Sequence, residues 1–249
     1  MKKIFPLVAL LALIASAPTS GWTAPDDSVN PAIVPVSRTG GITNRQAQVI
    51  QRAKDNPGPC DVVFIGDSIT QGWEGAGKAV WERFYGARRC LNFGVSGDRT
   101  EHVLWRFAHG QLDGVQPKAA VLMIGTNNSN NNKDGTEQYS ASQILEGVVT
   151  IVKEIRVRLP NTKLVLLGIF PRGQTFNHQR GKLLQVNQAL AKLADGDTIR
   201  YVDFGSQLIE ADGSLAKEIM PDFLHLTEKG YTIWAQAIEP QLKVILRYQ

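Results

Sequence analysis

The sequence predicts an α/β fold in which helices cover both faces of a parallel sheet. Short apolar runs rich in β-branched residues recur along the chain, and each ends at a glycine or a proline. Runs of this kind are typical of strands that are buried on both faces. Between the runs lie longer stretches whose apolar residues repeat at helical spacing. Strands that alternate with helices in this way form a parallel sheet.

Five runs qualify as strands, at residues 62–65, 91–93, 119–124, 164–170 and 199–204. The helical repeat is clearest over residues 144–159, where Pro160 ends it, and over residues 183–193. Residues 102–107 form an amphipathic pattern as well. A last helix should begin near Thr227 and bury Tyr231 and Trp234.

The start of the chain predicts export. Lys2 and Lys3 precede an apolar stretch at residues 4–15, and small residues follow it. This is the layout of a secretory signal peptide, and the stretch is too short to span a bilayer. We therefore expect a signal peptide at 1–24, an arm or linker at 25–44 and one catalytic domain at 45–249. The mature protein would be periplasmic or secreted, with no stable membrane anchor.

Charge and motifs exclude several classes of partner. The formal charge of +4 falls to +2 if Lys2 and Lys3 are removed, and no block of basic residues is interleaved with aromatic ones. Nucleic acid is therefore not an expected partner. The sequence has no His-Glu-x-x-His motif, cysteine cluster or phosphate-binding glycine loop. We expect neither a metal nor another cofactor.

Four short segments carry the candidate chemistry. Ser68, Gly94 and Asn127 each lie just past the end of a predicted strand, and Asp222 and His225 lie before the last helix. Ligands of open parallel sheets bind at the carboxyl ends of the strands, near the point where strand order switches. In a sheet of order 2-1-3-4-5, Ser68 and Asn127 would flank that point.

These residue types match the requirements of ester hydrolysis by a serine. Ser68 would be the nucleophile, His225 the general base and Asp222 the residue that orients the imidazole. The backbone amides of Ser68 and Gly94 and the side chain of Asn127 would stabilise the oxyanion. Each also has a simpler interpretation: a helix-capping serine, a surface histidine beside an aspartate, a turn glycine and a loop asparagine.

The segments resemble the sequence blocks of the SGNH (GDSL-type) hydrolases. Within that family, the likeness is greatest to the catalytic subunits of intracellular platelet-activating-factor acetylhydrolase, and it runs from about residue 62 to 238. It rests on these stretches: Gly66-Asp67-Ser68-Ile69, Asn92-Phe93-Gly94, His102-Val103-Leu104-Trp105-Arg106, Gly125-Thr126-Asn127-Asn128, Pro171-Arg172-Gly173 and Asp222-Phe223-Leu224-His225-Leu226-Thr227.

The resemblance implies a three-layer α/β/α, flavodoxin-like fold with a five-stranded parallel sheet of order 2-1-3-4-5. It also implies a Ser/His/Asp mechanism without a cofactor, small acyl ester substrates and pairing into a homodimer. The acyl pocket would be walled by Ile69, Thr126 and Leu224, which suit a short acyl group such as acetyl. The signature reads Gly-Asp-Ser-Ile rather than Gly-Asp-Ser-Leu, and the intracellular enzymes lack an export signal.

An exported carbohydrate O-acetylesterase is therefore the leading hypothesis. A phospholipid-type acetylhydrolase or lysophospholipase is the main alternative, because the resembled subunits act on lipids. An acyltransferase would use the same acyl-enzyme, and a carbohydrate-binding module would retain the fold without activity.

The two cysteines predict a disulfide. Cys60 precedes the first strand and Cys90 opens the second, so both should lie at the edge opposite the catalytic one. Neighbouring strands are about 4.8 Å apart, within the Cα separation of roughly 4.4–6.8 Å that a disulfide needs. Exported proteins meet oxidising conditions. We therefore expect a structural Cys60–Cys90 bond, with two buried thiols as the alternative.

Overall fold

The protein has three layers, a parallel sheet between two layers of helices, in a computed structural model that describes residues 29–38 and 43–247. The sheet contains β1 (Gly58–Gly66), β2 (Cys90–Gly94), β3 (Val115–Met123), β4 (Lys163–Leu167) and β5 (Ile199–Val202). Every pair is parallel, and the order is β2-β1-β3-β4-β5. The predicted α/β fold and strand order are confirmed.

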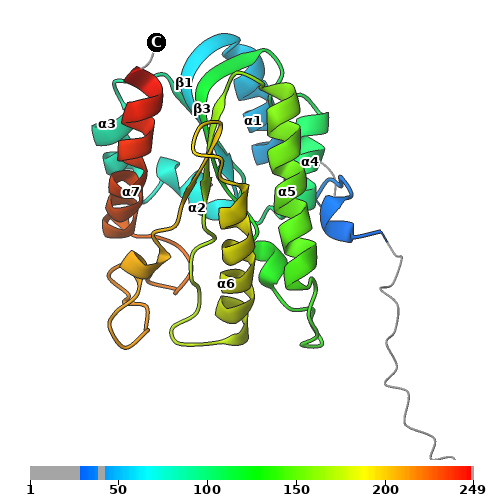
Figure 1. Ribbon diagram of the computed structural model, residues 1–249, viewed down its shortest axis with the longest axis vertical. Helices are drawn as coiled ribbons and strands as arrows, with labels where there is room; N and C mark the ends of the chain where they lie inside the picture. Colours follow the sequence, from blue (N-terminus) through cyan, green and yellow to red (C-terminus); the bar gives the residue numbers. More distant parts are fainter. Residues whose placement is uncertain (1–28, 39–42, 248–249) are drawn as a thin grey trace, which may run out of the picture.

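The helices divide between the two faces of the sheet (Figure 1). On one face, the core is formed with α1 (Asn44–Asp55), α4 (Thr100–Ala108), α5 (Ala141–Arg158) and α6 (His178–Leu190). The other face is covered by α3 (Lys78–Tyr85) and α7 (Glu228–Arg247). Successive residues of β1 enter the two cores alternately, as the period of a strand requires. The predicted helices at 144–159, 183–193 and the end of the chain correspond to α5, α6 and α7.

Buried aromatic rings pack α3 and α7 against the sheet. Trp73 and Trp234 are at most 1% exposed, and their ring centroids lie 5.0 Å apart. Tyr231 packs on the same Trp73 ring at 4.6 Å, and its hydroxyl donates a 2.6 Å hydrogen bond to the carbonyl of Ile69. Such rings supply much of the apolar area buried in a core. This cluster therefore fixes α7 against the short helix α2 (Ser68–Gln71).

Helix α7 continues through Pro240. A proline inside a helix has no N–H for the intrahelical bond and usually kinks or breaks the helix. We expect the burial of Trp234, Ile238 and Leu242 to hold the two halves together, because each side chain is fully buried.

The segment before α1 is docked on the helical layer over the residues described. A 3-10 helix, η1 (Pro31–Ile33), is capped by Asn30, whose amide also donates to Glu146 on α5 at 2.8 Å. The hydroxyl of Thr100 donates to the carbonyl of Ala32, and the N–H of Val36 donates to the carbonyl of Glu101.

The predicted signal peptide at 1–24 lies outside the described residues. The predicted domain limits and the predicted homodimer stay predictions.

None of the helices described over 29–38 and 43–247 has the length and apolar character needed to cross a membrane. The same residues contain no cluster of three His, Cys, Asp or Glu side chains that could hold a metal ion.

The predicted Cys60–Cys90 disulfide is wrong in this structure, because both cysteines are free thiols. The reason lies in the strand register. Cys90 lies opposite Val62 on β1, whereas Cys60 lies opposite Pro117 on β3. The two cysteines are therefore offset by two residues along neighbouring strands. Burial raises the pKa of Cys60 to about 11 and that of Cys90 to about 12.

Both thiols should therefore react slowly in the folded protein. Because only the thiolate reacts, pKa values this high should slow labelling at pH 8 by about 100-fold or more relative to free cysteine. Ellman's reagent should detect two thiols per chain after unfolding without reductant. Finding no thiol in that unreduced sample would show that the bond forms after all.

Candidate active site

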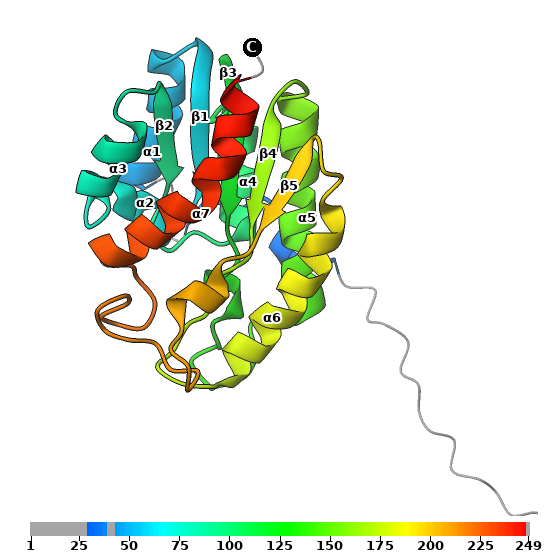
Figure 2. The same ribbon diagram turned by 60° about the vertical axis from the view of Figure 1, so that its left-hand side comes forward.

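Ser68 is the first residue of α2, directly beyond the carboxyl end of β1 (Figure 2). Asp67 caps this helix, since its Oδ1 accepts the N–H of Ile69 at 3.0 Å. The first N–H groups of a helix have no intrahelical acceptor. Within the described residues, the N–H of Ser68 also has no acceptor outside the helix. The cap thus presents both the hydroxyl and the amide of Ser68 at the sheet edge.

Asp67 itself is fully buried, and its Oδ2 has no partner within the described part of the chain. Burial raises the pKa of Asp67 to about 7 and nearby Asp98 adds to the rise, while the N–H of Ile69, His225 and Arg172 oppose it. Its contact with Ile69 makes Asp67 a helix cap.

His225 lies between Ser68 and Asp222. Its Nε2 is 2.9 Å from the Oγ of Ser68, and its Nδ1 is 2.6 Å from Oδ2 of Asp222. The carboxylate accepts a hydrogen bond from Nδ1–H, which leaves the lone pair of Nε2 free to accept the hydrogen bond of the Ser68 hydroxyl. Although partial desolvation raises it, the hydrogen bonds from His225 hold the pKa of Asp222 below its usual range. The structure therefore brings these three predicted residues together.

A tight turn makes this convergence possible. Oδ1 of Asp222 accepts the N–H groups of Leu224 at 3.1 Å and His225 at 2.8 Å. Phe223, which lies between Asp222 and Leu224, has φ of 59°. It is the one non-glycine residue with positive φ within 29–38 and 43–247. Such a conformation costs about 1–3 kcal/mol and persists where surrounding contacts fix it. Here the N–H of Gly173 donates to the carbonyl of Phe223 at 2.8 Å.

Asn127 opens a 3-10 helix, η3 (Asn127–Ser129), beyond the end of β3. Its Nδ2 donates to the backbone carbonyl of Asp98 at 2.9 Å. An amide NH₂ carries two donors, so the second can still be given to a substrate. The side chain of the adjacent Asn128 instead bonds Thr100 and Glu101 and is fully buried. Asn127 is thus oriented by its bond to Asp98, and the buried side chain of Asn128 anchors the residue that follows it.

Gly94 was predicted to offer its amide to an oxyanion, but that amide has a partner of its own. It donates to Oδ1 of Asn92 at 2.8 Å, while Nδ2 of Asn92 donates to the carbonyl of Thr70 at 3.0 Å. The structure gives Gly94 a packing role instead. A Cβ at this position would lie 2.6 Å from the carbonyl carbon of Thr70, so only glycine lets β2 approach α2.

Sequence reasoning missed Gly97 in the same loop. Its φ is 75°, which favours glycine, and its N–H has no acceptor among residues 29–38 and 43–247. The loop lies between α2 and Asn127, because Gln71 accepts the N–H of Ser96 and Asp98 accepts the Asn127 amide. The available signal was a second glycine three residues beyond the strand end.

The three residues predicted to wall the acyl pocket differ in exposure. Ile69 is 1% exposed and lies in the core beneath α7, where the partly buried Leu224 packs against the same cluster. Thr126 is buried, and its carbonyl accepts Nη1 of Arg172 at 2.8 Å. Ile69 and Leu224 therefore belong to the same hydrophobic cluster, and Thr126 is fixed by a neighbouring arginine.

Among the other histidines, His102 is a buried residue of α4. It is 6% exposed, and its Nδ1 accepts the backbone N–H of Arg99 at 3.0 Å. Burial lowers the pKa of His102 to about 4, so it is neutral at physiological pH. His109 stacks on Trp105 with ring centroids 3.7 Å apart.

Residues 64–233 match the model of the GDSL-like lipase/acylhydrolase family. The human platelet-activating factor acetylhydrolase IB subunit alpha1 is 36% identical over 187 residues, which are 75% of this chain and 77% of that protein. The rat alpha2 subunit is also 36% identical, over 191 residues that cover 75% of this chain and 76% of the relative.

Solved structures share the fold at lower identity. A GDSL-like lipase from Bacteroides thetaiotaomicron has a TM-score of 0.59 at 21% identity, covering 80% of this chain and 94% of that one. An acetylxylan esterase from Geobacillus stearothermophilus has a TM-score of 0.58 at 19% identity, covering 74% of this chain and 94% of that one. The chain therefore belongs to the GDSL-like lipase/acylhydrolase family, and it is a serine ester hydrolase.

Proposed function

We propose that the protein hydrolyses short-chain esters, acetyl esters above all, through Ser68, His225 and Asp222. The observation that carries this proposal is the continuous pair of hydrogen bonds from Ser68 Oγ to His225 Nε2, at 2.9 Å, and from His225 Nδ1 to Asp222, at 2.6 Å. A nucleophile, a base and an orienting carboxylate within hydrogen-bond reach are the parts that serine acyl transfer needs.

The reaction would proceed in two steps. In the first, Ser68 Oγ attacks the ester carbonyl, its proton passes to Nε2 of His225, and the alcohol leaves with that proton. In the second, water gives a proton to His225 and attacks the acyl-enzyme, which releases the acid and restores the Ser68 hydroxyl. Asp222 stays ionised throughout, in keeping with its lowered pKa.

The oxyanion formed in both steps needs preorganised donors. We propose the N–H of Ser68, the second N–H of the Asn127 amide and the N–H of Gly97. Gly97 replaces Gly94 in this set, because the Gly94 amide already donates to Asn92. The unpartnered N–H of Gly97 in the described structure supports the replacement.

We propose a carbohydrate O-acetyl ester as the substrate, met outside the cytoplasm after export. The features of a signal peptide in residues 1–24 support export. A small acyl group is supported by the hydrophobic cluster that contains both Ile69, beside Ser68 in the sequence, and Leu224, in the Asp222–His225 turn. A phospholipid-type acetylhydrolase is the second candidate, favoured by 36% identity to the acetylhydrolase IB subunits.

Three substrates assayed side by side separate these candidates. Acetylated xylan, an acetylated phospholipid and p-nitrophenyl acetate share the acetyl group but differ in the alcohol. A kcat/KM for xylan well above that for the phospholipid would support the carbohydrate esterase, and the reverse order would support the lipid enzyme. Release of acetate into water, compared with its transfer to an added sugar, tests for an acyltransferase.

Replacing the nucleophile should abolish hydrolysis and keep the fold. Ser68→Ala should lower kcat by about 10⁴- to 10⁶-fold, because the hydroxyl does the chemistry and contributes little packing. The exposed Ser142, on α5, provides a matched control, and Ser142→Ala should retain full activity. A Ser68→Ala variant that keeps more than a small fraction of the activity would refute the assignment.

Removing the Asn127 side chain should act on the transition state. Asn127→Ala should lower kcat by about 10²- to 10³-fold with little change in KM, because its donor matters most once the oxyanion forms. Asn131→Ala, at an exposed position nearby, serves as the control. If only KM changes, Asn127 binds substrate rather than stabilising the oxyanion.

Acyl chain length should govern the rate. If Ile69 and Leu224 close the pocket, p-nitrophenyl acetate should be hydrolysed far faster than the octanoate. Leu224→Ala should raise the octanoate-to-acetate ratio of kcat/KM by about tenfold or more, since each methylene accommodated in a pocket is worth about 1–3 kcal/mol. Similar rates for both esters in the unaltered enzyme would argue for an open, lipase-like pocket.

A further inference from the structure

Backbone carbonyls at the end of β2 and in the loop beyond it are each bound by an arginine. Arg52 donates to Asn92, Arg106 to Phe93, Arg45 to Gly94 and Arg38 to Ser96. Four arginine side chains therefore hold four carbonyls within five residues. Hydrogen bonds from a charged donor are also stronger than those between neutral groups.

Three of these arginines, at positions 38, 45 and 52, precede the part of the chain that matches the family model, residues 64–233. Arg38 lies at the end of the docked segment 29–38. That segment is anchored to α5 through Asn30 and to the start of α4 through Ala32 and Val36. The chain therefore brings a cation to the catalytic edge from outside the residues that match the family model.

The carbonyl of Ser96 and the N–H of Gly97 belong to one peptide group. In a planar trans peptide, these two groups point in opposite directions. A guanidinium that holds the Ser96 oxygen on one side therefore directs the Gly97 N–H to the other side. It also polarises the peptide, and a polarised N–H is a stronger donor.

We propose that Arg38 is a positioning residue of the oxyanion site, which fixes the Ser96–Gly97 peptide so that the Gly97 amide faces the substrate. The inference rests on the proposed function, in which that amide stabilises the oxyanion. Arg38 acts through the peptide and does not touch the reacting atoms.

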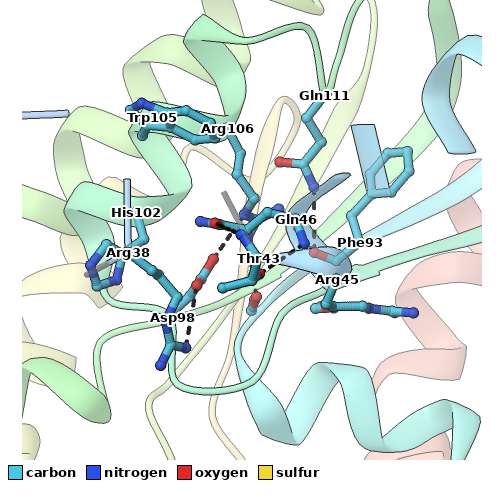
Figure 3. A network of polar contacts seen from close by, with 12 residues as sticks. Arg38, Thr43, Arg45, Gln46, Phe93, Asp98, His102, Trp105, Arg106 and Gln111 are labelled. Carbon is cyan, nitrogen blue, oxygen red and sulfur yellow. Dashed lines mark hydrogen bonds and ion pairs between the residues drawn. The ribbon is translucent and has the colours of Figure 1, made fainter. Parts of the chain in front are cut away.

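A second contact fixes the same loop. Nη1 of Arg38 lies 3.8 Å from Oδ1 of Asp98, an atom with no hydrogen bond among the described residues. The other oxygen, Oδ2, accepts Nε of Arg106 at 2.8 Å. Figure 3 shows Asp98 between the two arginines. The Asp98 carbonyl also accepts a hydrogen bond from the Asn127 amide at 2.9 Å. Arg38 therefore helps to position both proposed donors, the Gly97 N–H and the Asn127 side chain.

Gly97 is also what allows Arg38 to approach. A side chain at position 97 would collide with the guanidinium of Arg38. The Arg38 side chain remains 32% exposed, whereas Asp98 and Arg106 are fully buried. Removing one partner of a buried ion pair is strongly destabilising, so Asp98 and Arg106 are poor test positions. Arg38 can be changed with much less risk to the fold.

The test compares Arg38→Ala, Arg38→Lys and the unaltered enzyme on acetyl esters of different alcohols. Arg38→Ala should lower kcat by about 10- to 100-fold, the range expected when a reacting group is misplaced, with KM unchanged for every alcohol. Arg38→Lys should be intermediate, because an ammonium keeps the charge but lacks the planar fork. Low concentrations of guanidinium ion should restore part of the kcat of Arg38→Ala.

Arg156→Ala is the matched control. Arg156 is a partly buried arginine that also binds two backbone carbonyls, those of Thr162 and Pro160, near the start of β4. The Arg156→Ala variant should have an unchanged kcat, and added guanidinium should not alter that kcat. All rates are to be divided by the number of sites titrated with a fluorophosphonate, so that loss of folded protein does not lower the apparent kcat.

Two readouts separate positioning from a general structural role. Hydrogen exchange of the peptide that contains Gly97 should rise in Arg38→Ala and not in Arg156→Ala. In a double-mutant cycle, Arg38→Ala should lower kcat by a smaller factor in the Asn127→Ala background than in the unaltered enzyme. Both changes act on the same site, so their effects should not add.

A kcat within twofold of the unaltered enzyme, or a change confined to KM that varies with the alcohol, would overturn the inference. If the unaltered enzyme shows no Ser68-dependent hydrolysis of these esters, the proposed function is refuted instead. The hydrogen-exchange measurement would still report whether Arg38 fixes the loop.

Discussion

The buried guanidinium of Arg106 is the contact on which the catalytic edge depends. It donates to the carbonyl of Gly66 at the end of β1, to that of Phe93 on β2 and to the carboxylate of Asp98. The Ser68 helix and the Gly97 loop leave the sheet from these strand ends. One fully buried cation therefore sets the spacing between the proposed nucleophile and the proposed oxyanion donors. A buried arginine is tolerated only when it is paired and hydrogen-bonded in this way.

The arrangement of the sheet could be predicted because its strand centres are apolar on both faces, with a helical repeat between most of them. The residues at which the strands begin could not be predicted. β1 and β3 begin earlier than expected, at Gly58 and Val115, because their first halves carry prolines and polar residues that hide the strand pattern. The disulfide prediction failed for a related reason. Proximity at one edge followed from strand order, but the two-residue offset of Cys60 and Cys90 required the register.

At the site, sequence order was enough to select Ser68, Asn127, Asp222 and His225, since each side chain stands at a strand end or in the last loop. A backbone donor is harder to predict, because its availability depends on where its N–H points. The amide of Gly94 is used by a side chain only two residues away. The role of Arg38 was beyond prediction, because nothing in residues 25–44 indicates that they return to the catalytic edge.

The distance along the chain between the two halves of the site has a consequence for biosynthesis. Ser68 and His225 are 157 residues apart, and Tyr231, which supports the Ser68 helix, comes later still. Domains emerge from the ribosome amino-terminal end first, and contacts distant in sequence close last. A nascent chain would carry its proposed nucleophile, Ser68, through most of translation without the proposed base, His225, to activate it. Catalysis would begin only when the final helix docks, so chains truncated before His225 would be inert rather than weakly active.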